Sequence, residues 1–292
     1  MSHASITLVE VGARDGLQNE ANAAALDAHT KAIFIRMLAQ AGLTRIEGGS
    51  FVHPKAVPAM ANSAEVAALL HAVEIDFPDV IFSYLVPNLK GLERATAIGA
   101  KEVAVFLALA ESFSRANINV GVEESFAAIE PTIAAARAQH MRVRGYLSNL
   151  FGYSDYPFTP ADVVKRTQQF LEMGCFEVSL GDTTGIGTPE TTRSVMEALI
   201  ATAVPLEKVA MHFHDTFGNA IANVAVAYDM GIRVFDASTG GLGGCPYANS
   251  PKGNLAMETL VAWAQSRSIG CAVTDIHLLE KAAHYMRTAL GK

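Results

Sequence analysis

Short apolar runs alternate with longer amphipathic segments from one end of the chain to the other. The short runs have the length and composition of buried strands: Ile6–Val11, Arg45–Gly48, Val80–Leu85, Glu102–Leu107, Arg142–Ser148, Phe176–Leu180, Val209–His214 and Val234–Ala237. The amphipathic segments predict helices: His29–Ala41, Leu89–Ile98, Pro160–Met173, Pro189–Ala201 and Asn219–Met230. Several end just before a glycine, at Gly42, Gly99, Gly174 and Gly231, as helices with a glycine C-cap do.

Eight strands that alternate with helices indicate parallel pairing, and at 292 residues the natural closure is a (β/α)8 TIM barrel. We expect one domain over residues 1–292, with a short additional C-terminal helix near Ile276–Leu290. A doubly wound open sheet is the alternative. It needs a glycine-rich phosphate turn after the first strand, and Gly12-Ala13-Arg14-Asp15-Gly16 does not match that fingerprint.

Composition narrows the class of protein. Half of the residues are hydrophobic and 17% are charged, which is typical of a chain with a sizeable core. The formal charge is −7 without a basic tract, which argues against nucleic acid as a partner. No apolar run is long enough for a membrane span, and a strand at the very start leaves no room for a targeting peptide. Three widely spaced cysteines predict a reducing, cytoplasmic location.

Polar residues gather where the predicted strands end. In a TIM barrel the loops after the strands build the active site, so these residues should share one rim. They are Arg14 and Asp15 after the first strand, Glu47 and Ser50 at the second, Tyr146 and Ser148 at the fifth, Ser179 and Asp182 at the sixth, His212 and His214 at the seventh, and Asn254 after the eighth.

The sequence His212-Phe213-His214 places two imidazoles on one face of a strand, because side chains two residues apart point the same way. A core histidine beside a surface histidine is the alternative. With Asp15 and Asn254, the pair forms an oxygen and nitrogen donor set that suits Mg²⁺ or Mn²⁺; Zn²⁺ or Co²⁺ also fit. In the adjacent Arg14–Asp15 pair, the carboxylate can bind metal or take a proton while the guanidinium stabilises an oxyanion. The alternative is that Arg14 and Asp15 form only an exposed ion pair in a turn.

Two glycine-rich segments carry further candidates. The segment Gly240–Gly244 directly precedes Cys245. A glycine-rich loop can close over a ligand and bring the thiol of Cys245 to it. The alternative is that Cys245 is only a small residue in a tight turn. Cys175 and Cys271 lie in apolar surroundings and are expected in the core. In Gly181–Gly187, Asp182 can contact substrate or a metal-bound water, or form a turn or helix cap.

The motifs together resemble the 3-hydroxy-3-methylglutaryl-CoA (HMG-CoA) lyases, which are metal-dependent TIM-barrel enzymes. The segments that carry the resemblance are Glu10 to Glu20, Ile46-Glu47 with Ser50-Phe51, Asn88 to Gly91, Ser179 to Thr183, His212 to Gly218 and Gly241 to Ala248. The resemblance implies cleavage of the CoA thioester to acetyl-CoA and acetoacetate, with Mg²⁺ or Mn²⁺ as cofactor and an acyl-CoA as the small-molecule partner. It implies metal ligands at Asp15, His212, His214 and Asn254, catalytic roles for Arg14, Asp15, Glu47, His212 and Cys245, and substrate contacts from Arg14, Gln18, Ser50, Tyr146, Ser179 and Asp182.

Within the resemblance, either Asp15 or His212 is the expected proton acceptor. His53, Ala56 and the loop after Ser148 depart from the family pattern, so reaction type is better defined than acyl group. The alternatives are a lyase acting on citramalyl-CoA or a branched 3-hydroxyglutaryl-CoA, a Claisen-condensing synthase, and an inactive metal-binding barrel. A homodimer is expected only by analogy with similar barrels.

Overall fold

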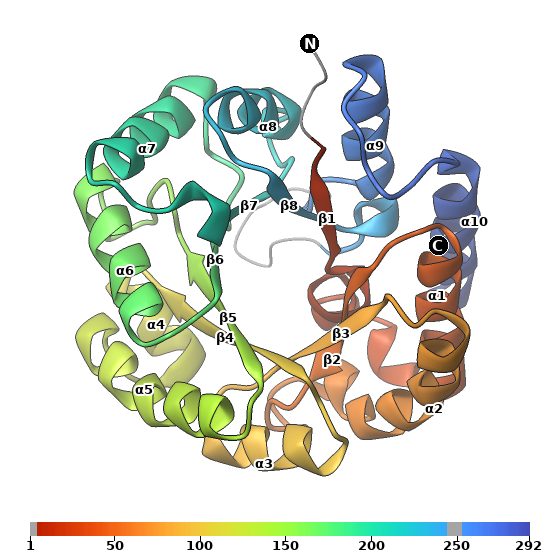
Figure 1. Cartoon of the computed structure of the whole chain (residues 1–292). Coiled ribbons are helices and arrows are strands. Elements are labelled where there is room, and N and C mark those ends of the chain that lie inside the picture. The colour runs from red at the N-terminus through yellow and green to blue at the C-terminus, as the bar shows by residue number, and fades with distance from the viewer. Residues whose placement is uncertain (1–4, 244–252) are drawn as a thin grey trace.

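The computed structural model describes residues 5–243 and 253–292, and it confirms the predicted TIM barrel with an additional C-terminal helix (Figure 1). Eight parallel strands pair in chain order, and β1 pairs with β8 to close the ring. The strands are β1 (Thr7–Glu10), β2 (Arg45–Ser50), β3 (Ile81–Leu85), β4 (Glu102–Ala108), β5 (Arg142–Ser148), β6 (Glu177–Asp182), β7 (Val209–Phe213) and β8 (Val234–Ala237).

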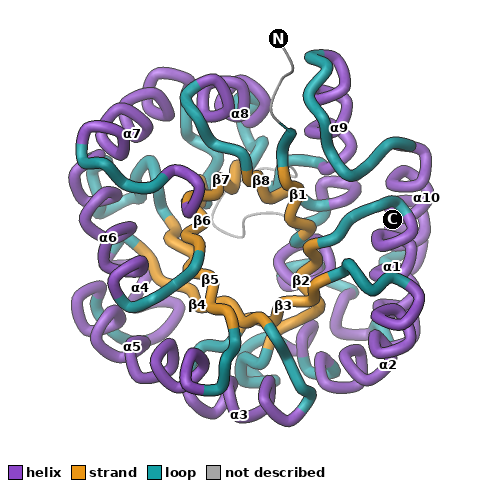
Figure 2. Tube along the Cα trace, in the orientation of Figure 1, coloured by secondary structure: helices purple, strands orange, loops and turns teal. Residues whose placement is uncertain are grey.

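The helices form a layer around the outside of the strands (Figure 2). They are α1 (Ala28–Gln40), α2 (Ser63–Asp76), α3 (Leu89–Ala97), α4 (Glu111–Ile118), α5 (Val122–Ala138), α6 (Pro160–Glu172), α7 (Pro189–Ala201), α8 (Ala220–Asp229), α9 (Met257–Ser266) and α10 (Ile276–Ala289). The additional helix is α10, which packs against α1. In the described part of the chain, no helix combines the length and the apolar character that crossing a bilayer requires.

The predicted elements agree with the structure to within one or two residues at their ends. Gly42, Gly99, Gly174 and Gly231 all have positive φ, which confirms that these helices end at a left-handed glycine. The helices α2, α4, α5 and α9 lie outside the predicted segments. Helix α2 carries apolar residues around most of its circumference, and α5 contains Pro131, so neither has a clear helical signature. Cys175 is buried as expected, whereas Cys271 is only partly buried.

Charged side chains cross the inside of the barrel. Arg144 of β5 contacts Glu177 of the neighbouring β6 and also Asp236 of β8, while Arg45 of β2 reaches Glu177 at 2.8 Å. Because β5 and β8, like β2 and β6, are not neighbours in the ring, their side chains must meet in its interior. Fully buried ion pairs need such mutual contacts to offset the cost of leaving water. The interior of the barrel therefore holds a network of paired charged side chains.

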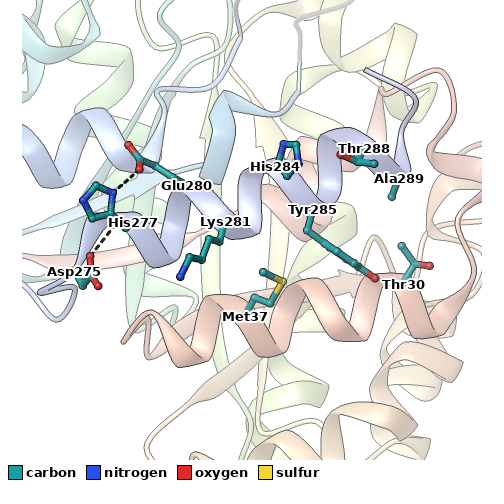
Figure 3. A pocket seen from close by; sticks show the side chains of 10 residues that line it. All are labelled: Thr30, Met37, Asp275, His277, Glu280, Lys281, His284, Tyr285, Thr288 and Ala289. Atoms are coloured by element: carbon teal, nitrogen blue, oxygen red, sulfur yellow. Dashed lines mark hydrogen bonds and ion pairs between the residues drawn. The ribbon is translucent and has the colours of Figure 1, made fainter.

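A hollow of about 1120 Å³ lies outside the barrel, between α1 and α10 (Figure 3). Met37 of α1 and Tyr285 of α10 face it from either side, and His277 and Lys281 add polar groups. This hollow belongs to the helical layer and shares no residue with the predicted site, so the chemistry has to be sought at the ends of the strands.

Candidate metal centre and active site

His212 and His214 project together from the end of β7, as the strand period predicts. Their Nε2 atoms lie 3.1 Å apart, and both rings are buried. Asp15, from the turn after β1, completes a group whose ligand atoms all lie within 4.8 Å of one another. The structure thus brings together three of the four predicted metal ligands from opposite ends of the sequence.

Asn254, the fourth predicted ligand, lies beside this group. Its backbone forms an isolated antiparallel bridge with His214, and its side-chain amide donates to Asp15 Oδ2 at 2.9 Å and to the Leu242 carbonyl at 3.1 Å. Its Oδ1 atom is buried and has no hydrogen-bond partner among the described residues. A buried carbonyl oxygen without a partner is costly, and a bound cation would satisfy it.

The chemistry of the donors fits a divalent cation. The pKa of His214 is lowered to about 4 by burial and by His212, so the ring is neutral at pH 7, the form that binds a cation. Burial alone would raise the pKa of Asp15, but the charges of Arg14, His212 and His214 outweigh it and lower that pKa to about 2. Two imidazoles, a carboxylate and an amide oxygen together form a set of ligands that binds divalent metal ions.

The turn that carries Arg14 and Asp15 is a single π-helical turn, Gly12–Gly16. The Gly12 N–H donates to Glu10 Oε1 at 2.6 Å, and a Cβ on Gly12 would come within 2.5 Å of that same oxygen. Glu10 also accepts from the N–H and the hydroxyl of Thr239, after β8. The Glu10 side chain therefore ties the turn after β1 to the segment after β8, and any side chain at position 12 would force this hydrogen-bonded group to move.

Arg14 links Asp15 to Glu47. Its Nε donates to Glu47 Oε2 at 2.8 Å, and its Nη1 donates to Asp15 Oδ1 at 2.8 Å. Glu47 is fully buried, and its Oε1 atom has no hydrogen-bond partner among the described residues. Burial raises the pKa of Glu47, although Arg14 opposes that shift. Arg14 thus holds one oxygen of this carboxylate and leaves the other free.

Tyr146 lies between two guanidinium groups. The Arg14 guanidinium carbon is 5.2 Å from the centre of its ring, and that of Arg144 is 4.9 Å away. The Tyr146 hydroxyl accepts a hydrogen bond from Arg144 at 2.6 Å. Tyr146 therefore connects the polar interior of the barrel to the Arg14–Glu47 pair, and its hydroxyl oxygen accepts a hydrogen bond from Arg144.

Of the other predicted substrate contacts, Asp182, Ser179 and Ser50 have protein partners of their own. Asp182 accepts from the Gly187 N–H at 3.0 Å, which is the turn role left open above, and burial raises its pKa to about 7. Ser179 donates to Asp236 at 2.7 Å. The Ser50 hydroxyl lies 3.4 Å from the Leu85 carbonyl oxygen, whereas Gln18 has a buried Oε1 without a partner among the described residues. Cys245 lies outside the described residues.

Sequence reasoning missed the residues behind the histidines, chiefly Arg144 and Asp236. Asp236 lies next to His212 in the β7–β8 register, and its Oδ2 is 3.5 Å from His212 Nδ1. Burial alone would lower the pKa of His212, but Asp236 and Asp15 raise it. This network has one signal in the sequence, which is a charged residue within an otherwise apolar strand. Arg144 and Asp236 are both of this kind.

The fold and the cluster define a TIM-barrel protein with a candidate divalent-cation site at the carboxyl ends of its strands. Comparison with known proteins supports this class. The family described as HMGL-like matches residues 5–284. A 3-hydroxy-3-isohexenylglutaryl-CoA/hydroxymethylglutaryl-CoA lyase of Pseudomonas aeruginosa is 46% identical over 98% of this chain and 93% of its own length.

Solved structures give the same result. An HMG-CoA lyase from Brucella melitensis superposes with a TM-score of 0.93 at 40% identity, covering 99% of this chain and all of that one. An HMG-CoA lyase from Acenitobacter baumannii, in complex with coenzyme A and 3-methylmalate, has a TM-score of 0.88 at 30% identity, covering 98% and 92%. The chain belongs to the HMGL-like family, the family of the HMG-CoA lyases, which are carbon–carbon lyases.

Proposed function

We propose that this protein cleaves HMG-CoA to acetyl-CoA and acetoacetate. The observation that carries the proposal is the group of partly buried Asp15 with buried His212 and His214, beside the Arg14–Glu47 pair, at the mouth of a barrel of the HMGL-like family. Family membership alone does not define a reaction, because function resides in the site. The proposal is supported by the closeness of Asp15, His212 and His214 and by the pairing of Arg14 with both Asp15 and Glu47.

We infer that the cation is Mg²⁺ or Mn²⁺ and that Asp15, His212, His214 and Asn254 would hold it. The unpaired, buried Oδ1 of Asn254 and the carboxylate of Asp15 supply the oxygen donors that these two ions prefer. When bound, such a cation lowers the pKa of a substrate hydroxyl and fixes its orientation.

The reaction requires a base, an anion-stabilising group and an acid. The proton of the C3 hydroxyl leaves, the C2–C3 bond breaks, and its electron pair forms the thioester enolate while C3 becomes the ketone of acetoacetate. A proton added at C2 then gives the methyl group of acetyl-CoA. Arg14 carries a buried positive charge that would stabilise the enolate oxygen. Cys245 remains the proposed proton donor to C2.

Glu47 is the best-placed proton acceptor. The sequence left Asp15 and His212 as the candidates, but Asp15 accepts from Arg14 and Asn254 with both oxygens, and its pKa of about 2 makes it a weak base. His212 needs Nε2 for the cation and has Asp236 beside Nδ1. Glu47 alone among these groups has a free, buried oxygen and a raised pKa, which suit a general base.

The acyl group of the substrate is a separate assignment from the reaction type. His53 and Ala56, which depart from the family pattern, are both exposed in the segment between β2 and α2. The Pseudomonas aeruginosa relative is named for a 3-hydroxy-3-isohexenylglutaryl-CoA as well as for HMG-CoA. A branched 3-hydroxyglutaryl-CoA is therefore the second candidate substrate.

The test is a panel of 3-hydroxyacyl-CoA esters, including HMG-CoA, citramalyl-CoA and a branched 3-hydroxyglutaryl-CoA, scored for release of acetyl-CoA. We expect release with added Mg²⁺ or Mn²⁺ and loss of release with EDTA. Asp15→Asn, purified in parallel, is the control for contaminating activity, since it removes the ligand carboxylate. Release that persists with EDTA, or no release from any ester, would contradict the proposal.

The remaining expectations concern the whole protein. We propose that residues 1–292 form one catalytic domain whose partner is the acyl-CoA substrate, and the absence of a basic tract still argues against nucleic acid. A cytoplasmic location rests on the cysteine pattern, and a homodimer rests on analogy with similar barrels.

A further inference from the structure

We propose that Asp236 is a positioning residue for the cation ligand His212, and that it keeps the ring proton on Nδ1 so that Nε2 is free to bind the cation. This inference rests on the proposed function, because it assumes that His212 is a ligand. Among the described residues, the hydrogen-bond and ion-pair partners of Asp236 are Arg144, Ser179 and His212, so its effect on the ligand cluster would act through His212.

The two ring nitrogens of His212 face different surroundings. Nε2 points into the ligand cluster, 3.1 Å from Nε2 of His214, whereas Nδ1 lies 3.5 Å from Oδ2 of Asp236. The pairing of β7 with β8 puts His212 and Asp236 directly side by side. A neutral imidazole carries a single N–H, and a carboxylate beside one nitrogen favours the proton there. Metal-binding histidines commonly donate their other ring N–H to a carboxylate. Asp236 is the carboxylate beside Nδ1, at ion-pair distance, and Nδ1 has no hydrogen-bond partner among the described residues.

Several buried hydrogen bonds fix the carboxylate of Asp236 in place, so it can orient the imidazole ring of His212. Arg144 donates to both of its oxygens, at 2.7 and 3.0 Å, and Ser179 donates to Oδ2 at 2.7 Å. Its side chain has no exposed surface. Arg144 is fixed in turn by Glu177 and by the hydroxyl of Tyr146. The carboxylate cannot rotate away without breaking several buried hydrogen bonds.

A purely structural role for Asp236 would be to neutralise Arg144 inside the barrel. Glu177 offers a matched comparison, because it also pairs with Arg144, at 2.7 Å, and is also buried, but it has no contact with His212. Glu177→Gln therefore removes a negative charge from the same guanidinium without touching the histidine. Any difference between Asp236→Asn and Glu177→Gln in cation binding isolates the contact with His212.

The experiment measures Mn²⁺ binding directly, by electron paramagnetic resonance titration of the full chain. We expect Asp236→Asn to weaken the affinity by about 10- to 100-fold, the usual effect of losing such a partner. Glu177→Gln should keep the wild-type affinity. Equal affinities in wild type and Asp236→Asn, or equal losses in both variants, would overturn the positioning role. If the wild-type protein bound no Mn²⁺, the proposed function would fail first, and this inference with it.

A second measurement needs no folded Asp236 variant. In ¹⁵N-histidine-labelled wild-type protein without metal, at an alkaline pH where the ring is neutral, two-bond proton–nitrogen correlations report which ring nitrogen carries the proton. The signals of His212 are identified by their absence in His212→Asn. We expect the proton on Nδ1. A proton on Nε2, the form that predominates for histidine in water, would overturn the inference.

Discussion

Replacing Glu47 with glutamine removes one charge from the Arg14 cluster and changes little of its shape. Arg14 Nε and Nη2 contact Glu47 Oε2 at 2.8 and 2.7 Å, and the glutamine oxygen can accept the same hydrogen bonds. Arg14 also keeps its 2.8 Å contact with Asp15. We expect a loss of roughly 1–3 kcal/mol in the free energy of unfolding, the usual cost of weakening a buried charged hydrogen bond. A domain with about 5–15 kcal/mol of stability stays folded at 25 °C.

Turnover should fall far more than stability. Removing a general base costs about 10²- to 10⁴-fold in rate, or roughly 3–5 kcal/mol in the activation barrier. Because burial raises the pKa of Glu47 and the base acts in its ionised form, wild-type activity should be full above that raised pKa and should fall as the pH drops through it. Glutamine does not titrate, so the variant should lose this dependence.

The assay is acetyl-CoA release from HMG-CoA at saturating Mn²⁺, followed across the pH range in which the protein stays folded. Glu102→Gln is the matched control, since Glu102 is also a buried barrel glutamate with a pKa raised by burial and an Oε2 without a hydrogen-bond partner among the described residues. Its ion-pair partners are Arg45 and Arg142, at 3.9 and 3.7 Å, and not Arg14. Wild-type turnover in Glu47→Gln, or an equal loss in Glu102→Gln, would refute the reasoning.

Two further predictions concern the cation and the thiol. His214→Ala should lower the affinity for Mn²⁺, because it removes a neutral ligand nitrogen 3.1 Å from that of His212, and activity should return in part at high Mn²⁺; full activity after metal removal would reject the ligand assignment. Cys245→Ala should depress kcat much more than it affects binding of the CoA ester, measured by KM and by direct titration; unchanged turnover would exclude the proton-donor role.

Much of the fold and part of the site follow from local sequence. The alternation of buried strands and capped helices predicts the barrel. The glycines after Ala41, Ile98, Met173 and Met230 are local signals for helix ends, because glycine adopts positive φ without a steric cost. The ligand pair in β7 is also local, since the strand period alone puts His212 and His214 on one face. Helix α5 could not be predicted as readily, because its stability comes from packing against its neighbours rather than from its own pattern.

Roles within the site depend on contacts that the sequence does not encode locally. Asp15 and His212 both appeared able to take a proton, and only their surroundings separate them from Glu47, which has an oxygen left free. The turn role of Asp182 was one of two alternatives until its contact with Gly187 was known. Hydrogen-bond satisfaction is a property of the folded neighbourhood, so residue type alone cannot assign these tasks.

By itself, the sequence determined the class of fold, the paired histidines and the reactive turn after the first strand, because each depends on residues close together in the chain. The sequence also predicted that Asp15 and Asn254 lie with those histidines, and the structure places them there. Only the tertiary structure decided that Arg144 and Asp236 pair in the barrel interior, with Asp236 beside His212. The physical reason is closure of the barrel. It brings β1 next to β8 and sends side chains of non-neighbouring strands into a common interior, where burial and pairing set the charge and the task of each.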